Sequence, residues 1–224
     1  MLCSIHQPNY LPYLGMFEKI ARSDVFVFYD ITQYTKNDYR NRNTIKWPNG
    51  PILLTLPTFA SLSQMIKDTK FDNRILAKHR KTIQSAYQKA PYFEQYKSIF
   101  EEIYAYQWDN ISDFDIMITK KLCEILWIQT KIVVLSDLVD HLQSKSTDAL
   151  IEVCKLVGAD EYLSGKDGKN YVEMEKFDEA WIKVYFQDYQ HPTYSQLWGD
   201  FIPYMSVIDL IFNEWPHSLK IIMG

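Results

Sequence analysis

Cysteine is scarce in this chain of 224 residues. The three that occur, Cys3, Cys123 and Cys154, are far apart in the sequence and form no Cys-x-x-Cys pair. An odd number of scattered thiols is typical of reduced cytoplasmic proteins and argues against a disulfide framework. No spacing of histidine, cysteine or acidic residues indicates a metal site, so we expect none.

Long apolar runs and an excess of positive charge are also missing. No stretch approaches the roughly 20 apolar residues that a membrane-spanning helix needs. The N-terminus lacks a signal-peptide pattern. The formal net charge of -4 provides no basic field to attract nucleic acid. We therefore expect a cytoplasmic protein without a membrane span and without a nucleic-acid partner.

Glycine is rare, with 7 residues, and the glycine-rich phosphate motifs are absent. Neither G-x-G-x-x-G nor G-x-x-x-x-G-K-[ST] occurs, and no G-x-S-x-G surrounds a candidate nucleophile. Cys3 lies inside an apolar run, where burial keeps a thiol protonated. The sequence consequently leaves the cofactor unknown.

Aromatic residues, by contrast, make up 15% of the chain and include 16 tyrosines. Hydrophobic residues at 47% and charged residues at 23% are usual for a globular domain and exclude a disordered chain. A chain of this length suits a single α/β domain over residues 1–224. Tyrosines often line polar ligand sites, although many of these rings must belong to the core.

The first 30 residues predict a strand, a helix and a second strand. Residues 1–5 form a short apolar run that ends in a turn-forming His-Gln-Pro-Asn sequence. From Pro12 onward, apolar residues recur at helical spacing until Ser23 and Asp24. Residues 25–29 are a second apolar run, rich in β-branched and aromatic side chains. Together these segments indicate a right-handed βαβ unit.

Further strand-like runs follow at residues 51–56, 131–135, 161–164 and 182–186. Helical periodicity dominates residues 72–129, which we interpret as a helical insertion or lobe within the domain. Two more helices are expected at residues 146–157 and 206–213. This alternation predicts an α/β fold: a Rossmann-like, mostly parallel sheet of about five strands with a helical insertion.

Polar residues crowd just after the first predicted strand. In an open α/β sheet, the carboxyl edge of the strands is where ligands bind. His6 is a candidate acid or base, because the pKa of histidine lies near neutral pH. Gln7 and Asn9, with Tyr10 beside them, offer donors and acceptors that suit sugar hydroxyls or an amide. The alternative is that these residues only form a turn and cap the strand.

A second polar group follows the second predicted strand and consists of Asp30, Gln33, Tyr34, Arg40, Asn41, Arg42 and Asn43. Two guanidinium groups close together match carboxylates and phosphates in bidentate geometry. The simpler interpretation is a solvated basic loop. The tyrosine and asparagine residues between the arginines favour a substrate-binding site.

Two later turns complete the predicted site. Ser164 and Gly165 follow a strand, and with Lys169 they form a turn whose backbone amides suit an anion. An ordinary turn is the alternative. Gln187 and His191 follow the last predicted strand, and His191 is a second candidate acid or base.

Several of these segments, in order, resemble the WbqC-like protein family. The resemblance begins with the opening His6–Gly15, which is its specific part, and includes the string Arg40–Asn43. Its other segments are Ser23–Val27, Lys78–His79, Lys89–Phe93, Leu163–Gly165, Phe186–Gln187, Tyr189, His191–Pro192 and Ile208–Asn213. The sequence departs from the family at Lys166–Asn170, where a more glycine-rich turn is expected. The resemblance spans nearly the whole chain and assigns no catalytic residue.

The resemblance implies an association with O-antigen and other surface-polysaccharide gene clusters, and a role in making or modifying a sugar precursor. We accordingly expect a transferase whose small-molecule substrate is a nucleotide-linked sugar. Arg40, Arg42 and Lys169 would neutralise phosphates, and His6 or His191 would move the proton.

Two alternatives to this transferase stay open. The layout of a strand, a His-Pro turn, a helix and a second strand is similar to that of nucleotidyltransferases of the HIGH-motif class, although the early turn holds only one histidine. A ligand-binding accessory module without turnover would use the same residues.

Overall fold

The computed structural model describes residues 1–224, and its centre is a sheet of five strands in the order β5-β2-β1-β6-β7. The strands are β1 (Leu2–His6), β2 (Val25–Phe28), β5 (Lys131–Val134), β6 (Glu161–Ser164) and β7 (Lys183–Phe186). Every neighbouring pair of these strands is parallel. The predicted α/β fold with a parallel sheet of about five strands is confirmed.

The order of the strands places a switch point between β1 and β6. From β1 the chain moves outward through β2 to β5, and it then returns to the other side of β1 for β6 and β7. The connections after β1 and β6 therefore leave the sheet in opposite directions, which opens a crevice at the carboxyl ends of the two strands. His6 is the last residue of β1 and Gly165 directly follows β6, so both lie at this edge of the sheet.

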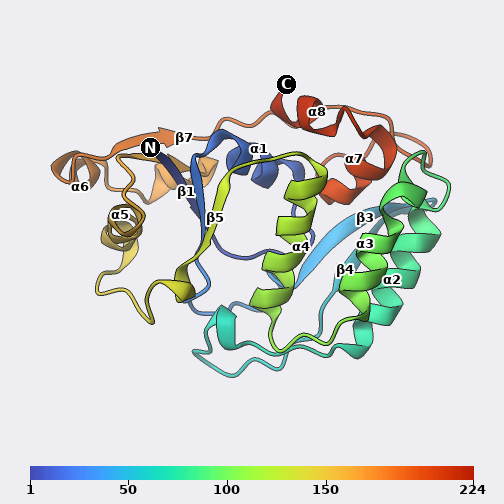
Figure 1. Ribbon diagram of the computed structural model, residues 1–224, viewed down its shortest axis with the longest axis horizontal. Coiled ribbons are helices and arrows are strands. Elements are labelled where there is room, and N and C mark those ends of the chain that lie inside the picture. The colour runs from blue at the N-terminus through green and yellow to red at the C-terminus, as the bar shows by residue number, and fades with distance from the viewer.

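Helices cover both faces of the sheet (Figure 1). Successive residues of a strand point to opposite faces, so neighbours such as Val25 and Phe26 pack in different apolar layers. Val25 belongs to a smaller apolar cluster that includes α5 (Ser146–Leu156) and α6 (Met174–Glu179). Phe26 belongs to a larger cluster on the other face. The helices of the larger cluster are α1 (Leu14–Arg22), α2 (Arg74–Tyr87), α3 (Phe93–Ala105), α4 (Ile111–Ile125), α7 (Val207–Glu214) and α8 (Ser218–Met223). Three short 3₁₀ helices complete the chain: η1 (Ile66–Asp68), η2 (Leu135–Asp137) and η3 (Lys166–Asn170).

A separate antiparallel hairpin lies outside the main sheet. It consists of β3 (Arg42–Trp47) and β4 (Gly50–Thr55). The strand predicted at residues 51–56 is therefore present as β4, but it pairs with a strand that the sequence did not predict. The pattern of β3 is not apolar, because its buried residues include the polar side chains of Asn43 and Lys46.

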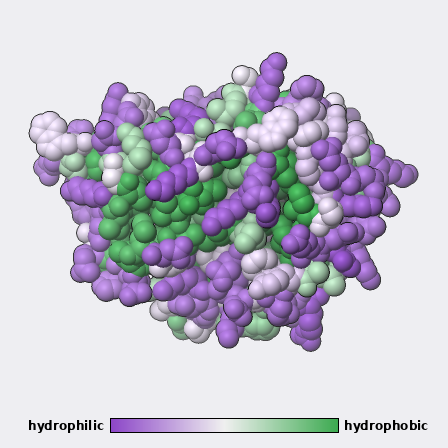
Figure 2. All heavy atoms as spheres, in the orientation of Figure 1, coloured by the Kyte–Doolittle hydropathy of each residue, from purple (hydrophilic) through white to green (hydrophobic).

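The helices expected between residues 72 and 129 are present as α2, α3 and α4. In Figure 1, α2 and α3 lie beside the hairpin, and α4 lies between them and the parallel sheet. The description of residues 72–129 as an insertion within one domain stays a prediction. No helix combines the length and the apolar character needed to cross a membrane. The face seen in Figure 2 is largely hydrophilic, with an apolar area over the region of β5.

Candidate functional site

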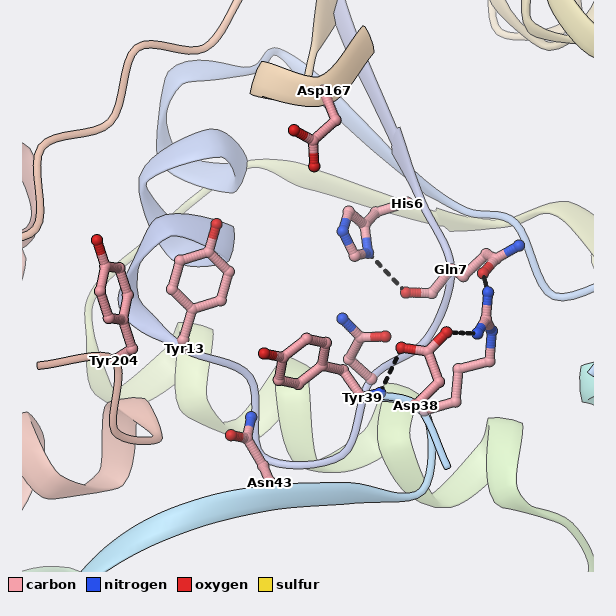
Figure 3. A pocket seen from close by; sticks show the side chains of 10 residues that line it. His6, Gln7, Tyr13, Asp38, Tyr39, Asn43, Asp167 and Tyr204 are labelled. Atoms are coloured by element: carbon pink, nitrogen blue, oxygen red, sulfur yellow. Dashed lines mark hydrogen bonds and ion pairs between the residues drawn. The ribbon is translucent and has the colours of Figure 1, made fainter. Parts of the chain in front are cut away.

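A polar hollow lies at the carboxyl end of β1, where the loop after β1 meets the segment that precedes β3. This space, the first hollow, encloses about 440 Å³. Its lining residues are His6, Gln7, Asn9, Tyr13, Asp38, Tyr39, Arg40, Asn43, Asp167 and Tyr204. Figure 3 shows their side chains around a common centre, with Asp167 and Tyr39 on opposite sides. Four segments that are distant in the sequence therefore contribute to one site.

A second hollow, of about 340 Å³, adjoins the first. The two share His6, Tyr13, Asp167 and Tyr204. The second hollow lies over α1 and the turn after β6, and its other lining residues are Ile5, Gly15, Met16, Lys19, Tyr162, Gly165, Lys166, Gly168, Tyr171, Gln187 and Tyr189. Because the hollows share a boundary, a single extended molecule can occupy both.

His6 is held in one orientation by the neighbouring backbone. Its Nδ1 lies 2.8 Å from the carbonyl oxygen of Gln7, which can only accept, so Nδ1 carries the proton. Burial, together with the positive charges of Lys19 and Arg40, lowers the pKa of His6 to about 3. The imidazole is therefore neutral at pH 7, and its unprotonated Nε2 faces the first hollow (Figure 3). This nitrogen can accept a hydrogen bond or a proton.

Arg40 closes one side of the first hollow, but its guanidinium is already engaged. It donates hydrogen bonds to side-chain oxygens of Gln7, Asp38 and Thr35. Burial acts to raise the pKa of Asp38, but the N–H of Tyr39 and the charge of Arg40 lower it overall. The paired charges of Arg40 and Asp38 largely cancel, so this part of the first hollow suits a neutral ligand group better than a phosphate.

Asn43 fixes the path of the loop after β1. Its side-chain nitrogen donates to the carbonyl oxygens of Tyr10, at 3.2 Å, and Leu11, at 2.7 Å. Its oxygen accepts from the N–H of Thr44 at 2.8 Å. Leu11 has a φ of 44°, a left-handed conformation that a branched residue rarely adopts. The bonds from Asn43 stabilise this conformation and therefore the position of Tyr13 two residues later.

Tyrosine rings form a wall that is common to both hollows. Tyr13 and Tyr204 line both spaces, and Tyr189 packs edge-to-face against Tyr13 with the ring centroids 6.4 Å apart. His191 packs against Tyr204 with a centroid distance of 4.8 Å, and its Nε2 accepts the N–H of Tyr204 at 3.1 Å. Rings that carry hydroxyl groups suit the mixed polar and apolar surface of a sugar or a nucleobase.

Seven of the residues predicted for the site line at least one of the hollows: His6, Gln7, Asn9, Arg40, Asn43, Gly165 and Gln187. The other nine line neither: Tyr10, Asp30, Gln33, Tyr34, Asn41, Arg42, Ser164, Lys169 and His191. The structure therefore brings the loop after β1, the segment before β3 and the ends of β6 and β7 together, but it turns many of their predicted side chains elsewhere.

Tyr10 and Asp30 are bonded within the fold. The hydroxyl of Tyr10 is buried, 2.9 Å from Nδ1 of His79 and 2.8 Å from the hydroxyl of Tyr104. Asp30 accepts a hydrogen bond of 2.6 Å from the hydroxyl of Ser136, in the segment that follows β5. Both residues connect elements of the core, which explains why they are polar and buried.

The remaining predicted residues of the second polar group also point away from the hollows. Tyr34 and Asn41 are buried and form hydrogen bonds within the fold. Gln33 is exposed. Arg42 donates to the backbone carbonyl of Asn37. Only Arg40 of the two arginines reaches the site.

Three residues predicted in the late turns, Ser164, Lys169 and His191, face neither hollow. Ser164 is buried, and Gly168 packs so closely on it that an added Cβ would lie 2.0 Å from its Oγ. Nζ of Lys169 lies 5.9 Å from the ring centroid of Phe186 and faces neither hollow. Both ring nitrogens of His191 are occupied by backbone groups. His191 therefore positions the wall of the site instead of facing a ligand.

Five residues of the first hollow were not predicted: Tyr13, Asp38, Tyr39, Asp167 and Tyr204. The sequence offered a signal for two of them: Asp38 lies just before the basic string Arg40–Asn43, and Tyr13 lies in the opening segment His6–Gly15. No local pattern points to Tyr204, which follows the last strand by 18 residues (204 - 186). Lys19, in the second hollow, lies in an amphipathic helix and resembles a surface lysine. No group of three or more histidine, cysteine or acidic side chains is placed to hold a metal ion.

Comparisons with known proteins show what the chain is similar to. It is 36% identical over 225 residues to "Uncharacterized protein Rv1507c" of Mycobacterium tuberculosis (strain ATCC 25618 / H37Rv), a match that covers 97% of this chain and 96% of that relative. No solved structure matches the chain. The sequence model described as the WbqC-like protein family matches residues 7–221, which include most of the lining of both hollows. The chain belongs to the WbqC-like protein family.

Proposed function

We propose that this protein is a transferase that modifies a nucleotide-linked sugar during the synthesis of surface-polysaccharide precursors of the O-antigen type. The observation that carries the proposal is the neutral imidazole of His6. Its free Nε2 faces a hollow lined by hydroxyl, amide and carboxylate groups at the switch point of the sheet. Membership of the WbqC-like family supports the polysaccharide context.

The lining of the first hollow favours a sugar as the ligand. Asn9 supplies both a donor and an acceptor, and Asp167 supplies acceptors only, which matches the hydroxyl groups of a pyranose. The ring of Tyr13 offers an apolar face for the C–H groups of the sugar. Arg40 and Asp38 are paired with each other, so the hollow carries little unbalanced positive charge.

His6 suits the role of general base in the transfer. Its Nε2 would remove the proton from a hydroxyl or amino group of the sugar as that oxygen or nitrogen attacks the electrophilic centre of the donor. The new bond forms to the sugar, and the leaving group departs from the donor with its electron pair. The carbonyl of Gln7 holds Nδ1–H and stabilises the imidazolium that forms. A general base whose pKa lies near the working pH contributes roughly 10²–10⁴-fold to a rate, and the negative charge of a bound nucleotide-linked sugar would raise the pKa of His6 from about 3 toward that range.

A non-catalytic binding module would use the same hollows and is the competing proposal. The comparison with HIGH-motif nucleotidyltransferases receives less support from the site. His6 is the only histidine that lines the first hollow, and the buried His79 is bonded to Tyr10 in the core.

The test is a search for a new product by mass spectrometry. The protein is incubated with nucleotide-linked sugars and with amino acids, acyl carriers or ATP as candidate donors. We expect a new mass with the wild type, none with His6→Ala, and an undiminished yield with His141→Ala, which changes an exposed histidine outside the hollows. Calorimetry should show that His6→Ala still binds the sugar nucleotide.

One result would contradict the transferase and another the role of His6. Binding of sugar nucleotides without any product from the wild type would favour the accessory module. A full yield of product from His6→Ala would show that His6 is not the base.

A further inference from the structure

Lys19 is a buried cation that the chemistry of the first hollow leaves unused. It lies on α1 and lines the second hollow, and only 3% of the residue is exposed. An ammonium group has three N–H donors, yet Nζ of Lys19 forms one hydrogen bond, to the carbonyl oxygen of Ile5 at 3.2 Å. A buried charge with unmet donors is unfavourable, so a ligand that supplies acceptors would stabilise it.

The groups around Lys19 offset its charge only in part, because burial lowers the pKa of Lys19 and outweighs the charge of Glu18, which acts to raise it. The carboxylate of Glu18, the next residue back, is engaged by a salt bridge within α1 and by the side-chain amide of Gln187 at 2.5 Å. His6 is neutral, and the neighbouring Cys154, together with burial, keeps the pKa of the Cys3 thiol above its ordinary value. The floor of the second hollow is therefore positive, and an anion is the ligand group that fits it.

The relation between the hollows indicates which anion. They meet at His6 and Asp167, so a ligand whose sugar lies in the first hollow extends into the second. In a nucleotide-linked sugar, the group that follows the sugar is a phosphate or diphosphate. Lys166, which also lines the second hollow, adds another cation. Asp167 lies at the shared boundary, where its carboxylate can accept hydrogen bonds from hydroxyl groups of the sugar.

We infer that the second hollow binds the diphosphate of the nucleotide-linked sugar and that Nζ of Lys19 is the buried donor that recognises it. This inference rests on the proposed function for the identity of the ligand. Lys19 is a binding residue in this account, and the proton transfer remains with His6.

The experiment compares binding of UDP, dTDP and GDP by calorimetry in the wild type, Lys19→Met and Lys169→Met. Methionine keeps the length of the buried stem and removes the charge. Lys169→Met is the matched control, because it makes the same substitution at a lysine that lines neither hollow. We expect the Kd of Lys19→Met to rise at least about 10-fold, the loss expected for a charged hydrogen bond. Lys169→Met should bind like the wild type.

A second readout separates a direct contact from a structural effect. Burial lowers the pKa of Lys19 to about 8 in the free protein, and a bound diphosphate will raise it. Calorimetry at pH 8.5 in buffers of different ionisation enthalpy should therefore detect proton uptake when the diphosphate binds. Lys19→Met should lose that uptake, and Lys19→Arg, which is always charged, should bind without it.

The outcomes distinguish this inference from the proposed function. Equal Kd values for the wild type and Lys19→Met, or unchanged proton uptake in Lys19→Met, would overturn the role of Lys19 even when the wild type forms product. Wild-type protein that transfers a group to a sugar but binds no nucleoside diphosphate would also overturn it. Urea denaturation of Lys19→Met establishes that a loss of binding is not a loss of folding.

Discussion

The guanidinium of Arg40 donates a hydrogen bond to the side-chain oxygen of Gln7 and another to the carboxylate of Asp38. These bonds join the loop after β1 directly to the segment before β3. They therefore hold two walls of the first hollow at a fixed separation, although the residues are more than 30 positions apart in the sequence.

Arg40→Lys should loosen these two walls. A lysine has one compact charged group and cannot bond both Gln7 and Asp38 in the planar geometry of a guanidinium. We expect weaker binding of the nucleotide-linked sugar, by about 10-fold, and a loss of about 1–2 kcal/mol in the free energy of unfolding. Calorimetry and urea denaturation measure the two effects. The matched control is Arg42→Lys, whose partner is a backbone carbonyl outside the hollows, and equal effects of the two substitutions would contradict the account.

His191 should act through Tyr204 and not as an acid or base. His191→Ala removes the acceptor of the Tyr204 N–H and should raise KM, whereas His191→Gln retains an acceptor and should restore most of the wild-type value. Neither variant should alter the pH dependence of kcat/KM. The steady-state pH profile checks this, and the loss of one limb of the profile in His191→Ala would show that His191 transfers a proton.

His6 should make the folded state less stable in mild acid. Burial, with Lys19 and Arg40, depresses its pKa from 6.5 to about 3, so between these values the unfolded chain binds the proton more readily. Stability is therefore lost as the pH falls through this window, by about 2 kcal/mol at pH 5. His6→Gln removes this contribution, so its stability relative to the wild type should rise by about that amount between pH 7 and pH 5. Urea denaturation at the two pH values tests this, and a pH-independent difference would contradict it.

Lys19→Met should stabilise the protein in the absence of a ligand. Burial lowers the pKa of Lys19 from 10.5 to about 8, so the folded state carries an unfavourable charge at pH 7. Between pH 8 and 10.5 the unfolded chain binds more protons than the folded chain, and the stability of the wild type rises with pH there. At pH 7 the substitution should add about 2–3 kcal/mol to the free energy of unfolding. A variant less stable than the wild type at pH 7 would identify Lys19 as a structural residue.

The parallel sheet could be predicted because most of its strands are short apolar runs next to turn-forming residues. The order of those strands placed His6 and Gly165 at one edge, which is where the hollows lie. The hairpin could not be predicted in the same way, because β3 buries the polar side chains of Asn43 and Lys46 beside Ile45, and Asn43 bonds to the backbone of another loop.

The side chains of the site were harder to predict than its location. Arg42 and Asn43 are adjacent in β3 and therefore point to opposite sides of the strand, so only Asn43 faces the first hollow. This alternation can be predicted only when the strand itself is predicted, and the sequence did not indicate a strand at β3. Tyr204 lies in a long segment without regular structure. Its N–H donates to His191, and such a tertiary contact has no sequence signature.

The central claim is that His6 is a neutral base that faces the ligand, and nitrogen NMR of histidine-labelled protein tests it most directly. The His6 signals are assigned by their absence in His6→Gln. We predict that Nδ1 of His6 stays protonated and Nε2 stays unprotonated from pH 8 down to pH 5, and that the Nε2 signal shifts when a nucleotide-linked sugar is added. Titration of His6 near pH 6.5, a proton on Nε2, or an Nε2 signal that ignores the bound ligand would contradict the account.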